Sequence, residues 1–147
     1  MDKDATLTAF RAAFNAMSDA VAGAYDDALT RRHSGGWSAR DVLAHFAGYH
    51  DDMAAAIAAV GRGERPAPPD GLTDDERNAL YAERAATRPV AEVITDWRAA
   101  FEHCYQAAQT VPDSVFGAPR GPGAWIAEET AHYHDHVADV RGWLGRA

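Results

Sequence analysis

The segment TAHYHDHVADVRGWL, residues 130–144, decides how the C-terminal part of this chain folds. Histidine occupies every second position in it, at 132, 134 and 136, so a β-strand would place all three imidazoles on one face. The apolar residues follow another period, with spacings of four, three and four between Tyr133, Val137, Val140 and Leu144. That period is typical of an amphipathic α-helix, and a strand here would be alone in the protein. We therefore predict a helix.

A helix separates the three histidines. With Ile126 at the centre of the apolar face, His136 and His132 lie about 80° and about 120° to one side. His134 lies about 80° to the opposite side. His132 and His136 therefore form a pair four residues apart, and Glu129 precedes that pair by one turn on the same side.

The N-terminal half of the chain has the same helical period. Its first apolar stripe predicts one long helix that reaches Tyr25 or Ala28 and ends before HSGGW, residues 33–37. Ser38, followed three residues later by an aspartate, predicts the N-cap of a second helix over roughly residues 38–61. Trp37 fits the hydrophobic staple that often accompanies such a cap.

Loop and cap signals divide the remainder. GRGERPAPPDGL, residues 61–72, reads as a long connection that is too short to separate two domains. Thr73 and Glu76 form a capping-box pattern that predicts a short helix to about residue 86. Pro89 suits the first turn of a longer helix, which PDSVFGAPRGPG, residues 112–123, would end.

Length and composition narrow the class of protein. A chain of 147 residues is the size of one domain, so we predict a single domain over residues 1–147: an all-α four-helix bundle with one additional short helix. The net charge of -8 disfavours a nucleic-acid partner. One cysteine, no apolar leader and no run of about 20 apolar residues favour a cytoplasmic protein without a membrane span.

The histidine pair raises the question of a metal site. Two imidazoles four residues apart can bind one ion, but a stable site needs a third ligand from another helix. The second predicted helix offers His45 and His50. They lie about 90° to one side and about 50° to the other side of its apolar face, so the residues alone leave both candidates open.

Two segments carry a resemblance to a known superfamily. GGWSARDVLAHFAGYHDDM, residues 35–53, contains the pattern W-S-x-x-D-V-L-A-H, and the opening segment contains H-Y-x-x-H. Together they resemble the DinB-like superfamily of four-helix bundles, which includes YfiT-type metal hydrolases, maleylpyruvate isomerase N-terminal domains and thiol S-transferases. Residues 63–71 and 76–101 are similar in spacing and composition to the ClbS/DfsB branch, whose members include some that work without metal.

The resemblance implies a site and a chemistry. By position it selects His45, with His132 and His136, as ligands of a divalent ion, and imidazole ligands favour zinc or nickel. Three protein ligands would leave open positions, as in a catalytic site. The implied enzyme is a hydrolase or thiol S-transferase that activates water or a low-molecular-weight thiol against a small electrophilic substrate. The resemblance also suggests a homodimer.

Other readings of the same residues are less specific. Glu129 suits a general base or a carboxylate that orients a ligand, although an acid is also favoured near a helix N-terminus. Glu129 and His132 form half of a di-iron motif, but no second Glu-x-x-His occurs. Cys104 lies on a predicted apolar stripe and reads as a packed core residue rather than a nucleophile.

Two functions from other classes remain open from the sequence. One is a metal-free binding or sequestration protein of the ClbS type, which would hold a hydrophobic small molecule near Trp125 and Trp143. The other is a dimeric scaffold in which the histidines are structural. Chelator-sensitive turnover would identify the enzyme, and chelator-resistant ligand binding would identify the sequestration protein.

Overall fold

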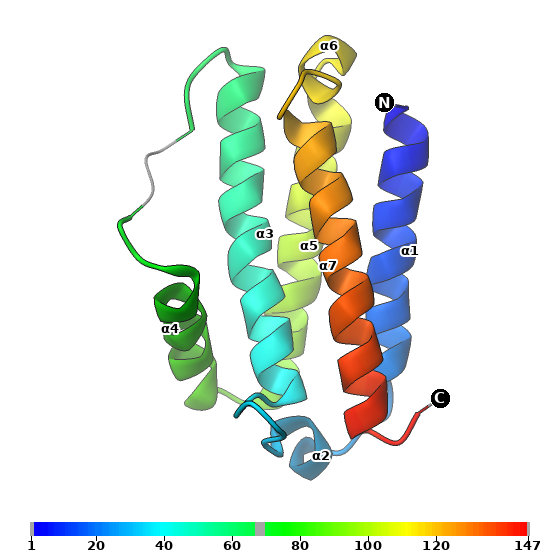
Figure 1. The fold of residues 1–147 in the computed structure, drawn as a ribbon, viewed down its shortest axis with the longest axis vertical. Helices are drawn as coiled ribbons and strands as arrows, with labels where there is room; N and C mark the ends of the chain where they lie inside the picture. Colours follow the sequence, from blue (N-terminus) through cyan, green and yellow to red (C-terminus); the bar gives the residue numbers. More distant parts are fainter. Residues whose placement is uncertain (1, 67–69, 147) are drawn as a thin grey trace.

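The computed structural model describes residues 2–66 and 70–146, which form seven helices and no strand. In chain order the helices are α1 (Lys3–Val21), α2 (Asp26–Thr30), α3 (Ala39–Gly61), α4 (Asp74–Ala86), α5 (Val90–Thr110), α6 (Asp113–Phe116) and α7 (Pro122–Trp143). The predicted all-α bundle is confirmed, with α1, α3, α5 and α7 as its long helices (Figure 1). None of the helices in this described part has the length and apolar character needed to cross a membrane.

The bundle consists of two tightly packed helix pairs. The most extensive contacts between elements are those of α3 with α5 and of α1 with α7. Figure 1 shows that α3 and α5 run in the same direction, opposite to α1 and α7. The chain must therefore return along the bundle between α3 and α5, and α4 forms part of that return while packing against the outside of α3.

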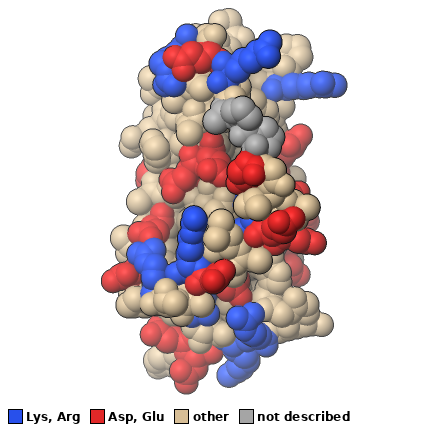
Figure 2. All heavy atoms as spheres, turned by 90° about the vertical axis from the view of Figure 1, so that its left-hand side faces the viewer, with Lys and Arg blue, Asp and Glu red and all other residues tan. Residues whose placement is uncertain are grey.

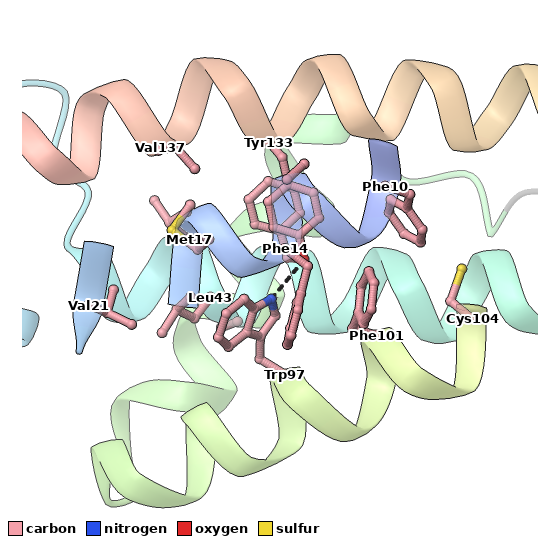
Figure 3. Close-up of a cluster of buried hydrophobic side chains, with 14 of the residues drawn as sticks. Phe10, Phe14, Met17, Val21, Leu43, Trp97, Phe101, Cys104, Tyr133 and Val137 are labelled. Atoms are coloured by element: carbon pink, nitrogen blue, oxygen red, sulfur yellow. Dashed lines mark hydrogen bonds between the residues drawn. The ribbon is translucent and has the colours of Figure 1, made fainter. Parts of the chain in front are cut away.

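Aromatic side chains fill the centre of the bundle. Phe14 of α1 stacks on Phe101 of α5, with ring centroids 4.0 Å apart, and Phe46 of α3 stacks on Tyr133 of α7 at 3.9 Å. Trp97 Nε1 donates a hydrogen bond to Tyr133 Oη at 2.9 Å, the dashed line in Figure 3. These contacts join all four long helices and fix how α3 and α7 face each other.

The predicted caps are confirmed. Ser38 Oγ accepts a hydrogen bond from Asp41 N at 3.2 Å, and the Asp41 carboxylate accepts one from Ser38 N at 2.9 Å. Thr73 and Glu76 form the second capping box at the start of α4. Each box satisfies backbone N–H groups that a helix N-terminus otherwise leaves free, so both helices begin where the sequence predicts.

The prediction for the first helix is wrong at its C-terminal end. α1 stops at Val21, Gly23 takes a φ of +70°, and a separate short helix, α2, begins at Asp26. Tyr25, predicted to be on the apolar stripe, is 85 % exposed. The stripe continues in the sequence because α2 again buries an apolar side chain, Leu29, so periodicity alone does not reveal the break.

The connection before α4 is only partly described. Its residues 67–69 lie outside the described residues. At its C-terminal end, Asp70 accepts hydrogen bonds of 2.7 and 3.1 Å from the guanidinium of Arg77. This ion pair ties the end of the connection to α4, which contributes one wall of the site described next.

Candidate metal centre

Three histidines from two helices converge between α3 and α7. His45 comes from α3, and His132 and His136 come from successive turns of α7. The Nε2 atom of His132 lies 3.1 Å from His45 Nε2 and 2.9 Å from His136 Nε2. Three ring nitrogens, one from each histidine, lie within 4.8 Å of one another. The structure thus brings together the three residues that the resemblance selects.

The other ring nitrogens of two of these histidines face hydrogen-bond acceptors. His45 Nδ1 lies 2.7 Å from Asn78 Oδ1, an amide oxygen on α4. His132 Nδ1 lies 3.2 Å from Glu129 Oε1. Because an amide oxygen and a carboxylate only accept, each Nδ1 carries a proton and donates it. In a neutral imidazole the Nε2 atom then carries a lone pair, which is the form that binds a metal ion.

Burial favours the neutral form of two of the imidazoles. Burial lowers the pKa of His45 to about 3, against the opposing effect of its hydrogen bond to Asn78. The charges that His132 and His136 would carry lower it further. The pKa of His136 is lowered too, first by burial and then by the neighbouring His132. Protons therefore compete weakly for the nitrogens of His45 and His136 at neutral pH.

Aromatic rings surround the cluster. Trp37 stacks on His136 at 5.9 Å between ring centroids and meets His45 edge-on at 5.5 Å. Phe46 lies within 5.1 to 5.4 Å of all three histidine rings. Trp37, predicted only as a hydrophobic staple, packs against the core and also covers one side of the cluster. These rings restrict the rotation of the imidazoles and exclude water from their sides.

The remaining side of the cluster opens into a cavity of about 520 Å³. Its lining is His45, Tyr49, Met53, Asp74, Asn78, Trp125, Glu128, Glu129 and His132. The volume suits a small organic molecule, since ligand pockets typically measure about 300–1,000 Å³. Two ring systems of the cluster therefore contact a space that can hold a substrate.

Glu129 lies at the inner end of this cavity. Its residue is only 6 % exposed, and its Oε1 accepts from His132. Both predicted roles of Glu129, a carboxylate that orients a ligand and a general base, stay predictions. Asn78 is the residue that sequence reasoning missed. A single amide on a short amphipathic helix carries no motif, so no signal in the sequence distinguishes it.

The other histidines stand apart from the cluster. His50 is fully buried in the core, where its Nε2 lies 2.6 Å from Tyr133 Oη. His134 is exposed on the opposite side of α7. His103 is 68 % exposed at its side chain. His33 stacks on Trp143 at 4.7 Å.

Two further predictions are tested by burial and by the cavity lining. Cys104 is fully buried, and burial raises the pKa of its thiol to about 12, which agrees with a packed core residue and not with a nucleophile. Trp125 lines the cavity, whereas Trp143 does not. The cavity therefore lies beside one of the two tryptophans near which the sequestration hypothesis places its ligand.

The donor set fits a divalent ion. If His45 and His132 are both neutral and both donate through Nδ1, their Nε2 lone pairs face each other at 3.1 Å. Two lone pairs at that distance repel unless a proton or a cation lies between them. Three imidazoles held in this way match the protein ligands of an open zinc site.

Fold and site together define a DinB-like four-helix bundle with a three-histidine cluster between its second and last long helices. The family described as the mycothiol maleylpyruvate isomerase N-terminal domain matches residues 10–141, and the chain belongs to this family. Comparison with curated proteins and with solved structures gives no match. The closer relation to the ClbS/DfsB branch stays a prediction.

Proposed function

We propose that this protein is a metal-dependent enzyme that holds a divalent ion, zinc or nickel, on His45, His132 and His136. The ion would serve to activate water or a low-molecular-weight thiol against a small electrophilic substrate. One observation carries the proposal: the Nε2 atoms of His45 and His132 meet at 3.1 Å while Asn78 and Glu129 occupy their Nδ1 atoms. The family's description, which names mycothiol, supports the thiol as the co-substrate class.

Each residue of the centre has a separate task in this proposal. His45, His132 and His136 supply nitrogen ligands, and Asn78 and Glu129 hold two of the rings in the correct tautomer. When bound, the ion supplies Lewis acidity that lowers the pKa of a water or thiol in contact with it. Hydrolysis and thiol transfer share this requirement, and the proposal covers both.

Glu129 is the proposed group that receives a proton. It lines the cavity, and its Oε1 contacts His132. A carboxylate in that place can accept the proton of a water or thiol in the cavity, or pass it on through a second molecule of water. In either case the negative charge of Glu129 also stabilises a cationic centre at the histidines.

Metal analysis tests the proposal. Protein purified without a histidine tag is compared with the variants His45→Ala and His136→Ala by elemental analysis. We expect about one zinc or nickel ion per chain in the wild type and a large loss in both variants, because two imidazoles alone bind weakly. Equal and negligible metal in all three proteins would refute the proposal.

A second function is supported by the cavity itself. A volume of about 520 Å³ beside Trp125 also suits a metal-free protein that binds and sequesters a small molecule. In that case a proton on His132 Nε2 would bridge to His45 in place of a metal ion. Ligand binding that quenches tryptophan fluorescence equally before and after chelator treatment favours this function over the enzyme.

A further inference from the structure

The cavity beside the histidines is acidic. Three of its lining side chains are carboxylates, namely Asp74, Glu128 and Glu129, and none of the described residues that line it is lysine or arginine. The three histidines add no charge when neutral. A bound divalent ion would contribute two positive charges at the inner end only, so the outer part of the cavity keeps uncompensated negative charge.

The carboxylates are spread from the inner end of the cavity to its mouth. Glu129 is buried against His132, whereas Asp74 and Glu128 are exposed. Asp74 begins α4 and accepts a hydrogen bond of 3.4 Å from Tyr49 Oη, and the Tyr49 ring lies 4.7 Å from that of His45. Asp74 is therefore two contacts away from His45, a proposed ligand of the ion.

The nearest basic residue in the sequence is already engaged. Arg77, next to Asn78 on α4, is paired with Asp70 at 2.7 Å and lies 3.7 Å from Asp52. Figure 2, which looks onto the side of the molecule that carries α4, shows several acidic side chains around its middle, with basic side chains above, below and among them. Arg77 is thus held by acids and does not line the cavity.

The walls between the two ends are aromatic and apolar. Tyr49, Met53 and Trp125 supply them. Aromatic rings together with carboxylates are the combination that binds organic cations, because the ring faces and the acids both attract positive charge. An anionic group beyond the reach of the ion finds no lysine or arginine in the cavity lining, and the carboxylates of the lining repel it.

We propose that the cavity selects substrates or co-substrates that carry an amine or another cationic group at the end remote from the reacting atom, and that it excludes dicarboxylates. The inference rests on the proposed function, which places the reacting end of the substrate at the ion. One anionic group of the substrate can be paired there. It rests on Asp74, Glu128 and the aromatic walls for the remote end.

Calorimetric titration with two probes of similar shape tests this selectivity. The cation is 2-phenylethylamine and the anion is 3-phenylpropionate, each titrated at neutral pH and low ionic strength. Each titration is done with the protein as purified and again after chelator treatment. The comparison shows whether the carboxylate of 3-phenylpropionate binds to the metal ion. After chelator treatment, we expect the amine to bind at least about ten-fold more tightly, a difference of about 1.4 kcal/mol.

Charge variants identify the cause. Asp74→Asn and Glu128→Gln should each reduce the ratio of the two affinities by about three-fold or more. Glu83→Gln is the matched control, because Glu83 is exposed on α4, outside the cavity lining, and its change in net charge is the same. The ratio in this control should equal that of the wild type.

The possible outcomes separate the two proposals. Absence of amine binding at millimolar concentration, equal binding of the two probes, or an equal response in Glu83→Gln would overturn the inference. A protein that is purified with metal but prefers the carboxylate after chelator treatment contradicts the inference alone. A protein without metal that still prefers the amine contradicts the proposed enzyme alone.

Discussion

Replacing Tyr133 by phenylalanine should cost far more stability than loss of one hydroxyl suggests. Trp97 Nε1 can only donate, so Tyr133 Oη accepts from it at 2.9 Å, and the same hydroxyl is hydrogen-bonded to His50 Nε2 at 2.6 Å. All three side chains are fully buried. Tyr133→Phe keeps the ring stacked on Phe46 but leaves both Trp97 Nε1 and His50 Nε2 without a partner.

The magnitude follows from these two orphaned groups. Each buried polar group left without a partner costs about 1–3 kcal/mol, so two such groups should lower the free energy of unfolding of Tyr133→Phe by about 2–6 kcal/mol. No cavity term is added, because the ring remains. With a urea dependence of about 2 kcal/mol per molar, the midpoint should fall by about 1–3 M.

Urea unfolding followed by circular dichroism measures this loss. Tyr81→Phe is the matched control, because Tyr81 Oη donates at 2.8 Å to Asp52, whose side chain is 61 % exposed. Water can replace that partner, so the control should lose less than about 1 kcal/mol. Equal losses in the two variants, both below about 1 kcal/mol, would refute the reasoning about the buried network.

Three further predictions concern the ligand orientation, the core histidine and the contact between α3 and α4. Asn78→Leu should weaken zinc binding by about 10–100-fold in a chelator competition assay. Asn78→Asp keeps an acceptor for His45 Nδ1 and should retain zinc binding. Similar zinc affinities for the two variants would contradict the role of Asn78 in orienting His45. Burial lowers the pKa of His50 to about 3, so the unfolded chain binds an extra proton between pH 6.5 and about 3. The free energy of unfolding of chelator-treated protein should therefore be highest above pH 6.5 and fall as the pH decreases. His50 should contribute about 1.4 kcal/mol per pH unit to this fall. His50→Gln should remove that contribution, as measured by denaturant titrations at several pH values. A Cβ on Gly48 would lie 2.4 Å from the Tyr81 ring, whereas one on Gly142 meets nothing within 4 Å. Gly48→Ala should thus lose about 1–3 kcal/mol and Gly142→Ala gain up to about 1 kcal/mol in thermal or urea unfolding, and a gain in both would contradict the close packing of α4 on α3.

The sequence predicts the elements whose cause is local. Ser38 and Thr73 cap their helices through residues three positions away, so the pattern contains the whole interaction. The break after Val21 was missed because it depends on the backbone of Gly23, and the apolar stripe continues across it into α2. A helical period records which side chains are buried but does not record where a helix is interrupted.

The site depends on contacts that no single helix contains. His45 and His50 both lie on the inner half of α3, and the packing of α3 against α7 decides that His45 meets His132 while His50 enters the core. Periodicity cannot rank the two histidines, and it was the resemblance that selected His45. Asn78 was not predicted, because its role arises only when α4 packs beside α3.

The central claim is that His45, His132 and His136 hold one divalent ion through their ring nitrogens. Anomalous X-ray diffraction from crystals of zinc-loaded protein tests it most directly. The account predicts one strong peak between the three imidazoles, about 2.0–2.1 Å from each ligand nitrogen, which is lost in His136→Ala and retained in His134→Ala. A peak elsewhere, or none at this position, would contradict the account.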